Sequence, residues 1–365
     1  MRFSCGKLLN MVVLMLPLLV GLVVGVVGVA GLGGCARGSS ASLERFTYAQ
    51  LHMGSKARIV LYAEDERKAR AAAGAAFARL AELDAALSDY RQDSEINRLC
   101  ARGVGGAGVW TPVSDDLFRV LARADELAGL TMGAFDHTVG PLSALWREAR
   151  RNGSLPPASE LEDAMRRVGW RLVRLHPTRG RGGGEVMLEQ DGMRIDFGAI
   201  GKGFGADEAL RAMRGLGVER ALVELGGDMA VGDPPPGESA WRIEIETGYG
   251  SGAGAGGRPV VLVANAGVAT SGDTEQYIEL GGVRYSHILD PRTGAGLTTR
   301  TAATVVAIDG ATADALASAA CVLGSERARE LLEKIPGLGV RMMVDGVESR
   351  FGPEAHRIES THENH

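Results

Sequence analysis

The second half of the chain constrains the fold most, because beyond residue 170 its apolar residues follow the period of short strands. Runs that alternate apolar and polar positions predict half-buried strands. We expect such strands at 171–175, 185–189, 193–197, 220–225, 241–246, 259–263, 277–280, 283–289, 303–308 and 340–344. The helices expected among them cover 203–216, 312–323 and 325–334. Neighbouring strands with helices between only some of them predict an α+β domain with a mostly antiparallel sheet and flanking helices.

Helical periodicity dominates the first half of the mature chain. A strand at 57–63 precedes an alanine-rich amphipathic helix at 64–87, and a loop with a short helix follows at 88–99. Ser114 is a suitable N-cap for a helix at 115–129, and further helices are expected at 141–150 and 159–168. Because no sequence feature marks a boundary between independent domains, we expect one domain over residues 47–350 and a tail over 351–365.

The N-terminus has the pattern of an export signal. Arg2 and Lys7 precede an uncharged apolar run over residues 8–32, which ends in Leu32-Gly33-Gly34-Cys35. This pattern predicts a lipoprotein signal peptide over 1–34, lipid attachment at Cys35 and a tether over 35–46. A retained transmembrane helix is the alternative. In both cases the remaining chain lies outside the cytoplasmic membrane, and we expect a lipid anchor at the periplasmic face of the inner membrane.

Charge and cysteine content exclude some classes of function. The formal net charge is −5 for the whole chain, and removal of the signal peptide, which carries two positive charges, makes it more negative. A mildly acidic chain without a basic run is not expected to bind nucleic acid. Cys100 and Cys321 are the cysteines that remain beyond the lipid site, and we expect separate buried thiols, although an exported location permits one disulfide.

Two glycine-containing stretches have the pattern of ligand-binding turns. In IDFGAIGKGFGAD, 195–207, a strand ends in an acid and a helix begins beside Lys202, so that backbone N–H groups and an ammonium can meet an anion. Its spacing is neither that of a Walker motif nor GxGxxG, and a plain turn with a solvated lysine is the alternative. In TMGAFDHTVGPL, 131–142, Asp136 sits in an apolar loop, where capping of a helix is the simplest role.

Two further stretches carry oxygen donors and a histidine. In TADALASAA, 312–320, Asp314 and Ser318 are four residues apart, so both oxygens lie on one helical face and can take part in a Mg²⁺ site. The alternative is that Asp314 only stabilises the positive, N-terminal end of the helix dipole. Thr270, Ser271 and Asp273 crowd a predicted turn, and His287 in SHILDPRTG, 286–294, is expected across the hairpin, either as a base or as a structural histidine.

These stretches, together with LSDYRQDSEINR, ALVELGGDMAVGD and ADALASAACVLG, occur in an order that resembles the ApbE family, from Met53-Gly54 to about residue 345. The family contains Mg²⁺-dependent FAD:protein FMN transferases. The resemblance implies a single ApbE-like, T-fold-like domain with FAD as substrate and Mg²⁺ as cofactor. It also implies that FMN is attached through a phosphoester bond to a serine or threonine of an acceptor, with release of AMP. The expected acceptors are flavoprotein subunits of membrane redox complexes or exported electron-transfer proteins.

Residue by residue, the resemblance assigns His287 as the catalytic base. It assigns the metal to the Ala199 carbonyl, Asp314 and Ser318, and it assigns FAD contacts to Met53, Tyr90, Ala134, Phe135, Asp136, Asp196, Lys202 and Ile288.

The chain departs from the family pattern at three positions. His137 stands where proline is usual, and Ser318 stands where threonine is frequent. The stretch DPRTGAG, 290–296, resembles the acceptor consensus D-x-x-S/T-G-A-T/S but ends in Gly296, so no self-modification is expected there. Two other functions remain open: an FAD pyrophosphatase with water as acceptor, and a non-catalytic flavin-binding lipoprotein.

Overall fold

The computed structural model describes residues 42–102, 105, 107–178, 182–245, 258–272 and 277–359, which belong to one compact unit. The predicted signal peptide, Cys35 and most of the tether lie outside the described residues. Within the described ranges, no helix is long and apolar enough to cross a membrane.

An eight-stranded sheet forms the centre of the fold, with the order β1-β2-β6-β7-β10-β13-β14-β15. Every neighbouring pair in it is antiparallel. The strands are β1 (Glu44–His52), β2 (Ser55–Ala63), β6 (Ala221–Leu225), β7 (Asp228–Val231), β10 (Ala266–Gly272), β13 (Thr301–Ala307), β14 (Gly339–Val344) and β15 (Val347–Phe351). The predicted α+β class with antiparallel pairing is therefore confirmed.

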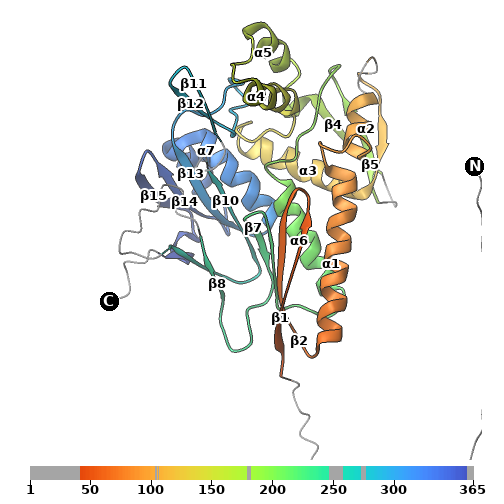
Figure 1. Cartoon of the computed structure of the whole chain (residues 1–365), viewed down its shortest axis with the longest axis vertical. Helices are drawn as coiled ribbons and strands as arrows, with labels where there is room; N and C mark the ends of the chain where they lie inside the picture. Colours follow the sequence, from red (N-terminus) through yellow and green to blue (C-terminus); the bar gives the residue numbers. More distant parts are fainter. Residues whose placement is uncertain are drawn as a thin grey trace, which may run out of the picture. The chain divides into compact units, whose positions relative to one another are not determined.

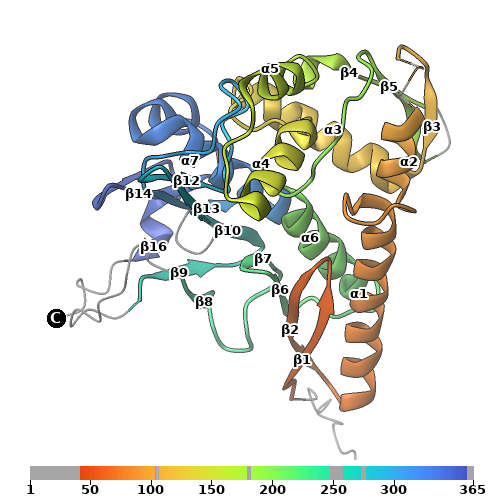
Figure 2. The same cartoon turned by 45° about the horizontal axis from the view of Figure 1, so that its top comes forward.

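Helices cover one face of this sheet and a small sheet covers the other (Figures 1 and 2). The helices are α1 (Glu66–Leu87), α2 (Glu95–Arg102), α3 (Asp115–Leu130), α4 (Gly140–Asn152), α5 (Ala158–Met165), α6 (Gly201–Arg214) and α7 (Gly310–Leu332). The smaller sheets are β16-β9-β8, β3-β5-β4 and the hairpin β11-β12. Their strands are β3 (Thr111–Val113), β4 (Val173–Pro177), β5 (Gly184–Leu188), β8 (Trp241–Glu244), β9 (Val260–Val263), β11 (Tyr277–Leu280), β12 (Val283–Ser286) and β16 (Ile358–Glu359).

The alternating pattern of the central strands buries apolar side chains on both faces of the sheet, in three hydrophobic clusters. On β2, Ile59 and Leu61 pack against α1 and α6, whereas Val60 points to the small sheet formed by β8, β9 and β16. On β10, Ala269 packs toward α7, and Val268 packs toward the small sheet. Because successive strand residues face opposite sides, both faces of the sheet are buried.

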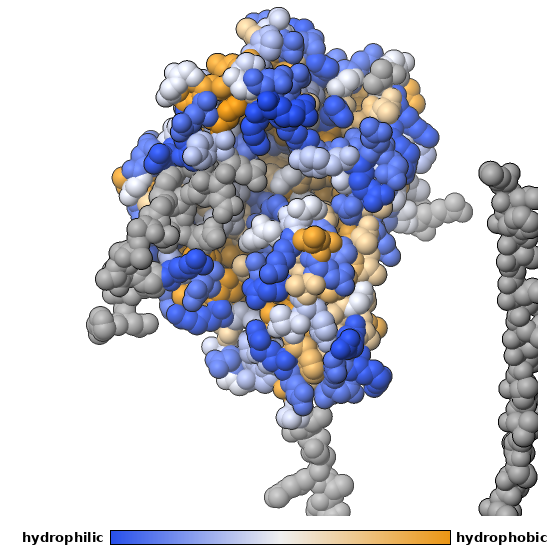
Figure 3. Space-filling view, viewed as in Figure 1, coloured by the Kyte–Doolittle hydropathy of each residue, from blue (hydrophilic) through white to orange (hydrophobic). Residues whose placement is uncertain are grey.

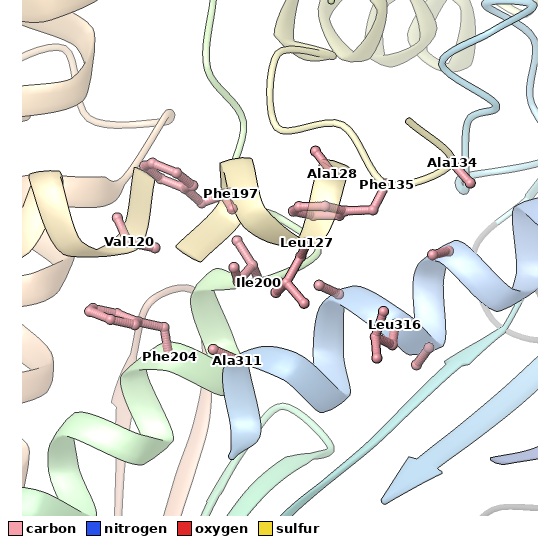
Figure 4. Close-up of a cluster of buried hydrophobic side chains, with 14 of the residues drawn as sticks. Val120, Leu127, Ala128, Ala134, Phe135, Phe197, Ile200, Phe204, Ala311 and Leu316 are labelled. Atoms are coloured by element: carbon pink, nitrogen blue, oxygen red, sulfur yellow. The ribbon is translucent and has the colours of Figure 1, made fainter. Parts of the chain in front are cut away.

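Helices α6 and α7 cross at two glycines. A Cβ on Gly203 would lie 2.1 Å from the carbonyl oxygen of Gly310, so the backbones touch at this point. The Asp207 carboxylate accepts hydrogen bonds from the N–H groups of Gly310 (2.7 Å) and Ala311 (2.9 Å) at the start of α7. Figure 4 shows Ile200, just before α6, in one apolar cluster with Leu127 of α3 and Leu316 of α7. The crossing thus fixes α7 relative to the start of α6.

Both ends of the predicted domain extend further than expected. Residues 44–46, assigned to the tether, belong to β1, which pairs with β2 around the turn Met53-Gly54. Residues of the predicted tail form β16, which pairs with β9. Both errors arise because an edge strand is stabilised by its partner strand, which the local pattern does not reveal.

Two other local predictions were wrong. Residues 193–197 run without a ladder and make only an isolated bridge between Arg194 and Val139. Thr270 and Ser271 lie within the central strand β10 and not in a turn, and Asp273 is outside the described residues. The two helices predicted at 312–323 and 325–334 are confirmed, because the backbone of α7 is non-helical at Gly324, where φ is 72°.

Candidate functional site

The first backbone N–H groups of α6 donate no hydrogen bond to the side chain of the N-cap residue. The N-cap residue is Ile200, which has no side-chain oxygen to accept a hydrogen bond. The Asp314 carboxylate, which comes from α7, accepts a hydrogen bond of 3.1 Å from the Gly203 N–H. A carboxylate therefore lies at the positive end of the α6 dipole, as expected for an anion-binding helix start.

An ion pair between a half-buried lysine and a buried aspartate lies beside this carboxylate. The Lys202 ammonium contacts the carboxylate of Asp228, the first residue of β7. Asp228 and Asp314 are each 2% exposed. Burial and the charge of Asp314 raise the pKa of Asp228 to about 7, against the opposing effect of Lys202. Burial also raises the pKa of Asp314, and the Lys202 charge opposes this shift. Two buried carboxylates with one ammonium lack one positive charge, so a cation fits here.

Two of the predicted metal residues share one face of α7 beside this ion pair. Asp314 and Ser318 lie one turn apart on α7, and the Ser318 hydroxyl is 2.9 Å from the hydroxyl of Ser271 on β10. Ala199 is in the turn that leads into α6. Within the described ranges there is no group of three or more His, Cys, Asp or Glu side chains suited to a metal. The predicted set contains only one acidic side chain, so its hard oxygen donors suit Mg²⁺ with waters or phosphate oxygens completing the shell. We call Lys202, Asp228, Asp314 and Ser318 the polar floor.

Tyr90 and Asp196, both predicted to contact FAD, are joined by Arg147 of α4. The guanidinium carbon is 4.5 Å from the centroid of the Tyr90 ring. The Arg147 Nη2 atom is 3.2 Å from Asp196 Oδ2 and 2.7 Å from Asp89 Oδ2. Burial and the charge of Asp196 raise the pKa of Asp89, and the Arg147 charge opposes this shift. The Tyr90 side chain remains largely exposed.

The Asp136 carboxylate makes hydrogen bonds that stabilise the local structure of the domain. The Asp136 carboxylate accepts from the Thr138 N–H (2.8 Å), the Thr138 hydroxyl (2.6 Å) and the Trp170 N–H (2.9 Å). Ala134 and Phe135 are buried, and Figure 4 shows Phe135 directed toward α3. Because these side chains face the core, any contact between the Asp136 loop and FAD would be made by backbone atoms.

His137 occupies the position where proline is usual in the family that the sequence resembles. Its ring is fully buried, and neither ring nitrogen has a hydrogen-bond partner among the described residues. Burial lowers its pKa, and the charge of Asp136 opposes this effect. Asp136 keeps its hydrogen bonds despite the substitution, which agrees with the expectation that the aspartate stays in place.

Met53 reaches the start of α6 from the β1–β2 turn. Its φ is 48°, and its sulfur would lie 3.0 Å from a Cβ on Gly205. The β1–β2 hairpin therefore places the Met53 side chain next to α6, the helix that carries Lys202.

His287 follows directly after β12 and is exposed, whereas Ile288 is buried. The loop behind them is anchored on two helices. The Trp146 Nε1–H on α4 donates to the Gly294 carbonyl oxygen (2.8 Å), and Arg292 donates to the Val322 carbonyl oxygen on α7 (3.3 Å). Val322 lies one helical turn beyond Ser318.

Helix α4 links the exposed residues, since Trp146 packs against Tyr285 with ring centroids 5.3 Å apart while Arg147 holds Tyr90. We call Tyr90 and His287 the exposed set. The face seen in Figure 3 is recessed between α4 with α5 and the β1–β2 hairpin.

Comparison with known proteins decides the family. A family model described as the ApbE family matches residues 53–342. The chain belongs to the ApbE family.

Relatives and solved structures agree with this assignment. A protein of Treponema pallidum named FAD:protein FMN transferase is 34% identical over 317 residues, which cover 84% of this chain and 86% of the relative. A protein of the same name from Haemophilus influenzae is 33% identical, and the alignment covers 70% of this chain and 73% of the relative. The crystal structure of the apo flavinyl transferase ApbE of Pseudomonas stutzeri matches with a TM-score of 0.72 and 28% identity, covering 88% and 96% of the two chains.

Sequence reasoning assigned no binding or catalytic role to three residues of this ApbE-family site. Arg147 was hidden inside a predicted helix, and no local signal indicates that its side chain reaches Tyr90. Asp228 closes the motif ALVELGGD, and an acid after two glycines at a strand start was a usable signal. Ser271 was noticed but was assigned to a turn instead of the strand that places it beside Ser318. Cys100 and Cys321 are separate buried thiols, as expected.

Proposed function

We propose that the chain is an FAD:protein FMN transferase that requires Mg²⁺. It attaches FMN through a phosphoester bond to a serine or threonine of an exported acceptor flavoprotein, and it releases AMP. Membership of the ApbE family and relatives that carry this enzyme name support the proposal. The observation that carries it is the polar floor, where Asp314 and Ser318 present two oxygens next to the Lys202–Asp228 pair at a helix start.

The donor set fits a magnesium ion. Asp314, Ser318 and the Ala199 carbonyl would hold it, and the excess negative charge of the buried carboxylates favours a cation there. When bound, Mg²⁺ supplies Lewis-acid polarisation of the pyrophosphate of FAD. Ser271 would orient Ser318 through the hydrogen bond between their hydroxyls.

The remaining residues bind FAD and move one proton. Lys202 has three N–H donors, so it can keep Asp228 as a partner and still donate to a phosphate oxygen. The acceptor hydroxyl attacks the phosphorus of the FMN half, the bond from that phosphorus to the oxygen of AMP breaks, and AMP leaves. The hydroxyl proton passes to the His287 imidazole. Because His287 is exposed, a protein side chain can approach it.

The test is an acceptor assay with the exported chain. Incubation with FAD, Mg²⁺ and a polypeptide that carries the acceptor consensus should increase the mass of that polypeptide by one FMN, with one AMP released per acceptor. If FAD binds but several cognate acceptors gain no mass, the transferase proposal is wrong. Release of AMP and FMN at the same rate without acceptor would instead identify an FAD pyrophosphatase, and FAD binding without any turnover would identify a flavin-binding lipoprotein.

We also propose that the chain is exported and lipid-anchored through Cys35 at the periplasmic face of the inner membrane. The support is the uncharged apolar run that ends in Leu32-Gly33-Gly34-Cys35. Metabolic labelling with a radioactive fatty acid should label the wild-type chain and should not label Cys35→Ala. Equal labelling of both would rule out this anchor.

A further inference from the structure

We propose that Arg147 is a positioning residue that holds the Tyr90 ring as a platform for one of the ring systems of FAD. This inference rests on the proposed function, because it names how the same site binds its substrate. The residues involved are Arg147, Tyr90, Asp89, Asp196 and Asn97.

The backbone that carries Tyr90 is already fixed without Arg147. Tyr90 lies two residues beyond the C-cap of α1, in a loop that leads to α2. The side-chain amide of Asn97, on α2, lies within hydrogen-bonding distance of the carbonyl oxygens of Ser88 (3.4 Å), Asp89 (3.0 Å) and Arg91 (2.8 Å). These contacts hold the path of the loop, so the freedom left at residue 90 is that of its side chain.

Arg147 is the contact that restricts this side chain. Its guanidinium carbon is 4.5 Å from the ring centroid, well within the range of a cation–π contact. Even so, Tyr90 remains 77% exposed. The ring is therefore supported on the Arg147 side and still exposes most of its surface to an aromatic ligand.

The two carboxylates fix Arg147 itself and offset its charge. Asp89 Oδ2 is 2.7 Å and Asp196 Oδ2 is 3.2 Å from the same guanidinium nitrogen. Asp196 is held in turn by the Gly198 N–H at 2.8 Å. Because two carboxylates already balance one guanidinium, Arg147 is poorly suited to capture the pyrophosphate of FAD. Its planar group is suited to stacking, which lysine cannot reproduce.

The experiment is a double-mutant cycle on FAD binding, with Arg147→Lys, Tyr90→Ala and the double variant. Arg147→Lys keeps the positive charge between Asp89 and Asp196 but removes the planar face. We expect it to raise the Kd for FAD about threefold to thirtyfold in the Tyr90 background. In the Tyr90→Ala background the same change should have almost no effect on Kd, because the platform is absent. Binding is followed by quenching of flavin fluorescence, which needs no turnover.

Two readouts separate positioning from general structure. A positioning role predicts a raised KM with unchanged kcat and an unchanged Tm for Arg147→Lys. A merely structural role would lower Tm and reduce kcat in both backgrounds, and this result would overturn the inference. An equal loss of FAD affinity with and without Tyr90 would also overturn it, because Arg147 would then act on FAD independently of Tyr90, either directly or through Asp196.

The inference and the proposed function fail in different ways. Normal FAD binding with no FMN transfer would refute the function, while the binding cycle would still decide the role of Arg147. Wild-type protein that does not bind FAD would overturn both.

Discussion

The polar floor and the exposed set differ in how firmly the fold holds them. Asp228 and Asp314 are almost fully buried at the α6–α7 crossing, where helix backbones, a dipole and an ion pair fix them. Tyr90 and His287 are exposed and lie in loops, where Arg147 of α4 contacts the Tyr90 ring and Trp146 of α4 anchors the loop behind His287. Groups that stabilise charge in a transition state must be preorganised and dry. Groups that meet a protein acceptor and a large dinucleotide must be accessible. The polar floor is thus suited to stabilising charge, whereas the exposed set is suited to contact with FAD and a protein acceptor.

The largest effect is expected in the polar floor, from Asp314→Asn. The amide keeps the shape and the oxygen that accepts from the Gly203 N–H, but it removes the charge that would hold the metal. We expect FMN transfer to fall by at least about 1,000-fold, because metal assistance is worth several kcal/mol. Initial rates of acceptor labelling at several Mg²⁺ concentrations measure this effect. Wild-type rates with an unchanged Mg²⁺ dependence would contradict it.

In the exposed set, His287→Ala should reduce kcat by about 100-fold, at the lower end of general-base effects, since water can reach this position. The Kd for FAD should not change, because the proposed role concerns the acceptor proton. His356→Ala is the matched control: it also removes an exposed histidine, and it should leave transfer intact. If both variants transfer FMN equally well, His287 is not the base.

A smaller effect, on the free energy of unfolding, tests the α6–α7 crossing next to the polar floor. Gly203→Ala places a methyl group 2.1 Å from the Gly310 carbonyl oxygen and must push α6 from α7, at a cost of about 1–3 kcal/mol in the free energy of unfolding. Gly74→Ala is the control, since its Cβ meets nothing within 4 Å and helix propensity should make it neutral or stabilising by about 0.5–1 kcal/mol. Urea titration compares the two. Equal stabilities would show that the crossing is not tight.

A further test is the pH dependence of stability at the same crossing. Burial and the charge of Asp309 raise the pKa of Asp207 from 3.8 to about 7, despite the two N–H groups that it accepts from. The folded state therefore binds this proton more tightly than the unfolded state. The resulting stabilisation is complete below pH 3.8 and is lost as pH rises through about 7. Asp207→Asn cannot titrate, so the Tm advantage of the wild type over the variant should shrink between pH 4 and pH 7. A constant difference across this range would refute the raised pKa.

The sequence was most informative where local pattern and local chemistry coincide. The N-cap at Ser114, the start of α6 near Lys202 and the spacing of Asp314 and Ser318 could all be predicted, because each depends on neighbours within one helical turn. The strand that carries Ser271 could not be predicted, because its stability comes from pairing with β7 and β13, which lie far away in the sequence.

Contacts between elements that are distant in the sequence could likewise not be predicted. Arg147 contacts residues more than forty positions away, and nothing in its own helix indicates their direction. Asp136 could be identified as a polar residue in an apolar loop, but the fold was needed to show that it accepts hydrogen bonds from Thr138 in the same loop and from the distant Trp170. The roles of individual side chains at the site followed from the family resemblance, and the physical pattern supplied only their chemical types.

The most direct measurement is a crystal structure of the chain with FAD and Mn²⁺ in place of Mg²⁺, using the anomalous signal of manganese. We expect one strong anomalous peak bound by the Asp314 carboxylate and the Ser318 hydroxyl, beside the pyrophosphate of FAD. A well-ordered pyrophosphate with the manganese peak at other residues would contradict the central claim that the polar floor is the metal site.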